Sequence, residues 1–239
     1  MAIGPERRYM TATQADAAQI DVGLRQYMMR VYDYMAGGLV LTGLIAFAVA
    51  QNESLLYALY GTPLKYLVMF APLGIALFFG FRIQTMAVGT AQALFWVFAA
   101  AMGLSLAYIF QVYTGTSIAR TFFITAGTFA GMSLYGYTTK RDLSAIGSFL
   151  IMGLWGIILA MIVNIFLQSA ALQFAVSIIG VLIFTGLTAF DTQKIKAWYA
   201  ETDGADVMAK KAIYGALNLY LDFINLFLFL LRFVGASRN

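Results

Sequence analysis

The sequence predicts an all-α polytopic membrane protein, a bundle of seven transmembrane helices. The first observation is composition: 62% of the 239 residues are hydrophobic, 11% are charged, and the mean hydropathy is +0.80. A soluble globular chain is about 25% charged. The second observation is that seven apolar segments approach the roughly 20 residues that a membrane helix needs. We therefore expect a cytoplasmic tail over residues 1–33 and one membrane domain over residues 34–239.

Short polar stretches separate the seven segments along the chain. A cleavable signal peptide is not expected, because about 30 mixed residues precede the first apolar run, which would itself direct insertion. The predicted spans cover residues 34–50, 64–80, 88–110, 118–136, 146–167, 172–190 and 213–231.

The distribution of cations predicts the orientation. In the seven-span arrangement, 11 of the 15 Lys and Arg residues fall on the side of the N-terminal tail. Cytoplasmic loops carry such an excess, so we expect a cytoplasmic N-terminus and an external C-terminus. The cations lie at span ends rather than in one patch, which argues against a nucleic-acid partner. Because Asp222 and Arg232 interrupt the last segment, a six-span protein with a re-entrant last segment is an alternative.

The absence of two residue types restricts the chemistry. The sequence contains no cysteine and no histidine, which excludes disulfides, thiolate nucleophiles, Cys/His zinc sites and imidazole acid–base catalysis. Proton or metal chemistry must therefore depend on carboxylates and other oxygen ligands. No tightly bound cofactor is expected.

The last segment carries three polar side chains on one helical face. Asn218, Asp222 and Asn225 follow one another at positions i, i+4 and i+7, so they project in one direction. An ionised carboxylate at mid-membrane costs roughly 2.5–3.5 kcal/mol on insertion scales. Asp222 therefore needs a partner, a proton or water, and this face should point inward. The simpler interpretation is a protonated Asp222 that only holds helices together.

A second carboxylate, Asp191, ends the sixth segment, one turn after Thr188. Lys194, three residues further on, is a candidate surface partner for it. Consecutive membrane helices run antiparallel and are often neighbours, so Asp191 and Asp222 are expected to face each other. Their depths do not match if the last helix starts at residue 213. Either that helix begins in the cytoplasm or water reaches the pair.

Two carboxylates in contact cannot easily both ionise, so the pair is expected to share one proton. With one proton the pair bridges two helices. With none, the helices separate or a cation enters between them. Arg82, at the cytoplasmic end of the second segment, is either a third member that neutralises the ionised pair or a topology charge.

Three stretches together resemble the Bax inhibitor-1 family, also called the TMBIM family, and in particular its bacterial branch. They are "SLYGYTTKRDLS", "VLIFTGLTAFDTQKIK" and "GALNLYLDFINLFLFLLRF". The resemblance implies a seven-helix bundle with the last helix at its centre and a pH-sensitive calcium leak governed by an aspartate pair. It places that pair at Asp191 and Asp222, and the arginine that pairs with them at Arg82. A bacterial inner-membrane location follows from the same resemblance.

Oxygen-only chemistry agrees with calcium, a hard cation that takes six to eight oxygen ligands. Asp191 and Asp222 with Asn218, Asn225 or Thr188 are too few for a tight site. Conduction requires that the ion can leave, so we expect transient coordination at the aspartates and a polar lining from the other three residues.

Two other functions fit parts of the sequence. Two membrane aspartates could activate water in an intramembrane protease, but the "GxGD" motif of such enzymes is missing, and we expect no enzymatic activity. Some bacterial relatives are described as modulators of a membrane-bound ATP-dependent protease, and a tail carrying Arg7 and Arg8 would suit such a partner. The expected partners are thus membrane lipid, calcium ions and, in this alternative, that protease.

Overall fold

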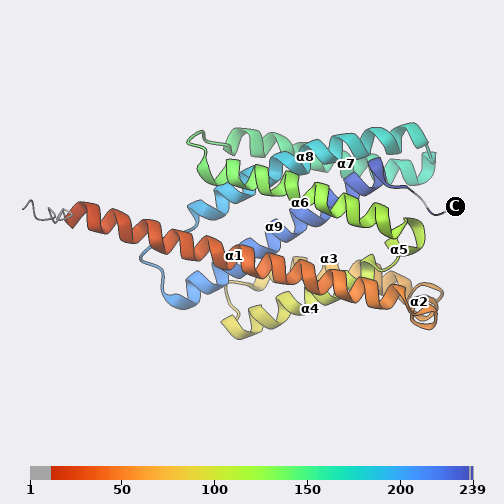
Figure 1. Cartoon of the computed structure of the whole chain (residues 1–239), viewed down its shortest axis with the longest axis horizontal. Coiled ribbons are helices and arrows are strands. Elements are labelled where there is room, and N and C mark those ends of the chain that lie inside the picture. The colour runs from red at the N-terminus through yellow and green to blue at the C-terminus, as the bar shows by residue number, and fades with distance from the viewer. Residues whose placement is uncertain (1–11, 237, 239) are drawn as a thin grey trace, which may run out of the picture.

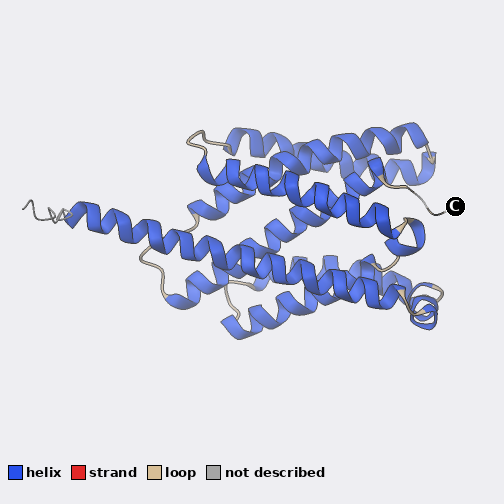
Figure 2. Ribbon diagram, viewed as in Figure 1, coloured by secondary structure: helices blue, strands red, loops and turns tan. Residues whose placement is uncertain are grey.

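The computed structural model describes residues 12–236 and 238, and this part of the chain consists of helices and connecting loops (Figure 2). Seven of its helices are long and two are short. The helices are α1 (Ala12–Ala50), α2 (Glu53–Tyr60), α3 (Leu64–Arg82), α4 (Val88–Leu106), α5 (Ile109–Val112), α6 (Gly115–Thr138), α7 (Ser144–Leu167), α8 (Ala170–Ala197) and α9 (Ala205–Val234).

Six of the seven predicted apolar segments each lie within one helix, whereas residues 88–110 are divided between α4 and α5 by a turn at residues 107 and 108. Two helices begin much earlier than predicted. Helix α1 starts at Ala12, so the predicted boundary at residue 33 falls inside it, and the division into tail and domain stays a prediction. Helix α9 starts at Ala205 rather than at residue 213. Hydropathy detects only the apolar part of a helix, whereas both helices extend into polar sequence. The short α2, whose Leu55 N–H is capped by the Asn52 side chain at 3.0 Å, was not predicted.

Six described helical segments are both long enough and apolar enough to cross a membrane. Helix α6 is long enough at 24 residues, but its threonines, serines and glycines make it more polar, so the count of seven spans depends on this helix. Helix α9 is unbroken over 30 residues, about 45 Å at 1.5 Å per residue. The re-entrant alternative for the last segment is therefore not seen. The six segments are Val22–Ala50, Leu64–Arg82, Val88–Val112, Ser144–Leu167, Ala170–Ala197 and Ala205–Val234.

The long helices form two groups of three, joined by α9. Helix α4 packs on α1 and α3, while α8 packs on α6 and α7. Helix α9 lies between the groups and packs on α1, α4, α6 and α8 (Figure 1). Its most apolar window is 61% buried, against 6% for α7. The expectation that the last helix is central is therefore confirmed.

Buried hydroxyls hold the first group to α9, and a close backbone contact holds α6 to α8 in the second group. Tyr220 of α9 and Thr42 of α1 share a hydrogen bond of 2.6 Å, and the Thr42 hydroxyl also lies 2.7 Å from the Ala99 carbonyl oxygen of α4. In the other group, a Cβ at Gly136 would collide with the backbone of Ala189, so α6 and α8 touch backbone to backbone. The two groups make little direct contact with each other, which leaves a seam on either side of α9.

Candidate functional site: an aspartate pair beside the central helix

The two predicted aspartates lie on α8 and α9, which share the most extensive helix contact in the described chain. Glycines permit this approach at both ends of the contact. A Cβ at Gly215 of α9 would lie 2.9 Å from Cγ2 of Ile195, and one at Gly180 of α8 would lie 2.5 Å from Cδ1 of Phe229. Because real Cβ atoms do not approach so closely, larger residues would force the two helices apart.

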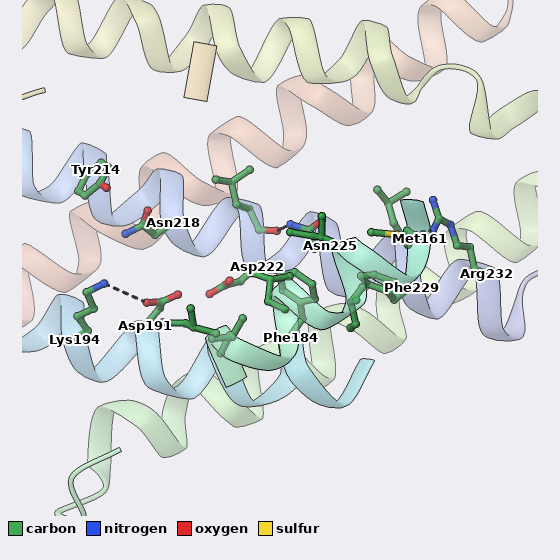
Figure 3. A pocket seen from close by; sticks show the side chains of 17 residues that line it. Met161, Phe184, Asp191, Lys194, Tyr214, Asn218, Asp222, Asn225, Phe229 and Arg232 are labelled. Atoms are coloured by element: carbon green, nitrogen blue, oxygen red, sulfur yellow. Dashed lines mark hydrogen bonds and ion pairs between the residues drawn. The ribbon is translucent and has the colours of Figure 1, made fainter. Parts of the chain in front are cut away.

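Asp191 and Asp222 point toward each other across this contact (Figure 3). Asp222 is only 5% exposed, and its Oδ2 atom has no hydrogen-bond partner within the described part of the chain. The Asp191 side chain is 18% exposed. The sequence left two explanations for how the two aspartates reach the same depth. The structure agrees with the first of them, because helix α9 begins before its apolar segment.

A cavity of about 510 Å³ lies beside the pair. Both predicted asparagines, Asn218 and Asn225, line it together with the two aspartates. The Asn225 amide donates to the Leu221 carbonyl oxygen at 2.8 Å, which holds this side chain against its own helix. The remaining lining is largely aliphatic and aromatic, so the cavity carries a narrow polar strip through apolar walls.

Five half-buried residues, followed by the exposed Arg232, form a continuous stripe along α9 that faces the seam between α3 and α7. Five of them also line a second cavity of about 600 Å³ on the α3 side, so the stripe borders both cavities. Arg232 ends the stripe at its far end, where Nη1 lies 3.9 Å from the Met161 sulfur. The spacing of three and four residues was readable in the sequence. The stripe consists of Tyr214, Asn218, Leu221, Asn225, Leu228 and Arg232.

The cation beside the pair is Lys194, not Arg82. The Lys194 Nζ atom lies 4.0 Å from Asp191 Oδ1, and its side chain is 45% exposed. Arg82 is exposed at the end of α3 and does not line the cavity. The prediction that Arg82 neutralises the pair is therefore not met in this structure. The alternative of Asp191 pairing with Lys194, three residues away, is the one observed.

Thr188 does not belong to the predicted polar lining. It is fully buried outside the cavity, and its hydroxyl donates to the Phe184 carbonyl oxygen at 2.8 Å within α8. Threonine hydroxyls in helices commonly bond backward in this way. The sequence showed that Thr188 lies near Asp191, but not that its oxygen was already satisfied.

The sequence also did not predict a buried chain of hydroxyl groups that reaches Thr192, the residue after Asp191 on α8. Tyr32 of α1 shares a 2.6 Å hydrogen bond with Ser133 of α6, and Ser133 lies 3.0 Å from the Thr192 hydroxyl of α8. Thr192 in turn donates to the Thr188 carbonyl oxygen at 2.7 Å. These residues come from three distant segments, and nothing in their local sequence indicated that they meet.

The site offers few ligands to a metal ion. No group of three or more acidic side chains that could hold a metal occurs in the described residues. The two carboxylates, with the side-chain oxygen of Asn218, could contribute to the six to eight oxygens that calcium takes, and water would have to supply the rest. Such a donor set suits an ion that passes rather than one that stays.

Comparison with known proteins assigns the family. A model of the family described as "Inhibitor of apoptosis-promoting Bax1" matches residues 24–239, which include both aspartates. The chain belongs to the Bax inhibitor-1 family. The resemblance seen in the three sequence stretches is thereby confirmed.

Bacterial members of the Bax inhibitor-1 family are similar to this chain over nearly their whole length. "Uncharacterized protein RP147" of Rickettsia prowazekii is 52% identical over 219 residues, 92% of this chain and 93% of the relative. "Inner membrane protein YbhL" of Escherichia coli K12 is 48% identical over 220 residues, 90% of this chain and 94% of the relative. "Uncharacterized membrane protein SpyM3_0260" of Streptococcus pyogenes is 34% identical over 229 residues, 92% and 96% respectively. With its apolar helices, this Bax inhibitor-1 family member is a multi-pass membrane protein.

Proposed function

We propose that this protein is a pH-sensitive calcium leak whose gate is the Asp191–Asp222 pair. The observation that supports this most is the buried Asp222 carboxylate, whose Oδ2 atom lacks a hydrogen-bond partner among the described residues while the Asp191 carboxylate faces it. An isolated charge in such a place is costly. A proton held between the two carboxylates removes that cost, and so does a cation that passes between them.

The charge balance at the pair gives the gate its mechanism. With one proton, the pair carries one negative charge, which the Lys194 ammonium 4.0 Å from Asp191 partly offsets. When that proton leaves, two negative charges face each other across α8 and α9. They repel, or they admit a cation, and calcium then competes with the proton for the same oxygens. Calcium binding at the pair should therefore strengthen as pH rises.

The stripe along α9 supplies the path for the ion on either side of the gate. Asn218 and Asn225 offer amide oxygens on the two sides of Asp222 along α9. Weak, spaced ligands let an ion enter and leave, as conduction requires. The path ends near Lys194 on one side and Arg232 on the other. From the charge bias of the loops, we place the Lys194 end of the path on the cytoplasmic side of the inner membrane.

Calcium flux into proteoliposomes tests this function. Flux should change steeply with external pH in the parent protein and lose that dependence in Asp191→Asn and Asp222→Asn. Asp206→Asn, which removes an exposed carboxylate in the first turn of α9, is the matched control and should titrate like the parent. An unchanged titration in both pair variants would reject the gate. Sodium and proton flux measured in parallel establish which ion the path conducts.

The two alternative functions stay predictions. The partner role was expected of the tail with Arg7 and Arg8, which lie outside the described residues. Deleting residues 1–25 separates the two ideas, because a leak through the bundle should survive the deletion and a partner contact should not. Loss of membrane-peptide cleavage in either Asp→Asn variant would be needed to support an intramembrane protease.

A further inference from the structure

The second seam of the bundle, between α1 and α6, holds a groove that the aspartate site does not use. Its volume is about 760 Å³, the largest of the cavities described above. Methionines and Leu39 of α1 form one wall, Ala130 and Leu134 of α6 the other, and Phe223 of α9 closes the base. We call this cavity the α1–α6 groove.

The groove is apolar along its length and cationic at one end. Among the residues whose side chains the structure describes, no acidic one lines the groove, and Arg25 is the one charged lining residue. At the same end lies Tyr137, whose ring sits 4.9 Å from the Nζ atom of Lys196. That ammonium also donates to the Tyr137 carbonyl oxygen at 2.8 Å. An occupant with an apolar body and an anionic head would match both parts.

The length of the apolar part matches one leaflet of a bilayer. Met28 and Leu39 are 11 residues apart on α1 and both line the groove, a distance of about 16–17 Å at 1.5 Å per residue. Half of a 30 Å hydrocarbon core is about 15 Å. A single acyl chain that starts near Arg25 would therefore end near Leu39, close to the bilayer midplane.

The polar atoms in the groove wall already have partners. The Tyr32 hydroxyl shares its hydrogen bond with Ser133, and Ser133 continues to Thr192. These hydroxyls therefore need no hydrogen bond from an occupant at mid-depth. This favours a hydrocarbon chain over a transmembrane helix that would bring polar side chains, and over a path for ions.

We propose that the α1–α6 groove binds one acyl chain of an anionic phospholipid, with the lipid phosphate against Arg25 and Lys196. This site is separate from the aspartate pair, and its occupancy is measured without ion flux. The cations at its mouth select the head group, and the methionine and alanine walls accept the chain. The wall of the groove is joined by hydrogen bonds from Tyr32 through Ser133 to Thr192, on the helix that carries Asp191.

Lipid retention by the purified, delipidated protein tests the proposal. Phosphatidylglycerol and phosphatidylcholine with identical chains are titrated in detergent, and bound lipid is counted by native mass spectrometry. Arg25→Gln should weaken phosphatidylglycerol binding about fivefold, as expected for one cation near anionic lipid. Its matched control is Arg30→Gln, on the same helix but lining a different cavity. Ala130→Phe, which fills the groove, should abolish the bound lipid of either kind.

A second control separates filling of the groove from damage to α6. Gly131→Phe adds the same ring one residue further along, where a Cβ meets no atom within 4 Å, and should retain lipid like the parent. A preference for phosphatidylglycerol that falls about fivefold in Arg25→Gln, together with no bound lipid in Ala130→Phe, supports the site. Equal retention of both lipids by the parent and all variants would overturn it. So would a protein dimer that Ala130→Phe dissociates, because a second copy would then occupy the groove.

Discussion

Asp222 of α9 and Asp191 of α8 face each other across the most extensive helix contact in the described bundle, and the Lys194 ammonium lies 4.0 Å from Asp191. Asp222 is 5% exposed, with one carboxylate oxygen unpartnered in the described chain. A buried acid in that position is unfavourable as a lone charge.

Replacing Asp222 by asparagine should keep the fold and remove a pH dependence of stability. The amide has the same shape and can donate to Asp191, so the thermal unfolding midpoint in detergent should equal or exceed that of the parent at alkaline pH. There the parent pair holds two charges. Asp206→Asn, on the exposed first turn of α9, should unfold with the parent's pH profile. A variant that unfolds earlier than the parent at alkaline pH would contradict this, because it would mean that the Asp222 charge stabilises the fold.

Removing Lys194 should move the flux titration, whereas removing Arg82 should not. The Lys194 ammonium lies 4.0 Å from Asp191 but is 45% exposed, so solvent weakens the interaction to at most about 1 kcal/mol. Lys194→Gln takes away a charge that favours the ionised pair, so its midpoint should shift to higher pH by less than about one unit. Arg82→Gln is the comparison, because Arg82 is exposed and outside the cavity. The reverse ranking would place Arg82 at the gate.

Adding one methyl group at Gly136 should destabilise the second helix group. In Gly136→Ala the new Cβ would collide with the Ala189 backbone, which cannot rotate away as a side chain can. We expect a loss of about 1–3 kcal/mol, typical of overpacking, seen as a lower unfolding midpoint. Gly131→Ala on the same helix meets open space and should be neutral or stabilising. Equal behaviour of the two variants would show that α6 and α8 do not touch at Gly136.

The hydrogen bond between Tyr220 and Thr42 should respond unequally to removal from its two sides. Tyr220→Phe leaves Thr42 bonded to the Ala99 carbonyl oxygen, so the expected cost is about 0.5–1.5 kcal/mol. Thr42→Val strands the buried Tyr220 hydroxyl, which should cost about 1–3 kcal/mol. Chemical unfolding of both variants in one detergent measures the difference. A larger loss for Tyr220→Phe would contradict this arrangement.

The sequence predicted the helices well where apolar runs end in sharp breaks. The fifth span ends at Leu167 as predicted, since Gln168 adopts a left-handed conformation with φ of 49° that stops the helix. The start of α9 was missed because "ADVMAKKA" is polar yet helical. Hydropathy cannot show that a helix continues into water.

The candidate site was predicted in part for a similar reason. Spacing along one helix placed Asn218, Asp222 and Asn225 on a common face, and the structure puts all three in one cavity. Arg82 was assigned to the pair by charge, but which seam α3 faces depends on packing between distant helices. No local sequence pattern indicates that packing. For the same reason the sequence did not indicate the hydrogen-bond partners of Tyr32.

Infrared spectroscopy of the protonated carboxyl group tests the central claim most directly, because it counts the protons on the aspartates. At neutral pH the parent should show one protonated carboxyl band, which disappears as pH rises. The band should be absent at neutral pH from Asp222→Asn, which leaves only the more exposed Asp191. It should remain but titrate at a different pH in Asp191→Asn, where the buried Asp222 still avoids a lone charge, and it should be unchanged in Asp206→Asn. A parent without such a band, or a band that survives unchanged in both pair variants, would contradict a proton shared between Asp191 and Asp222.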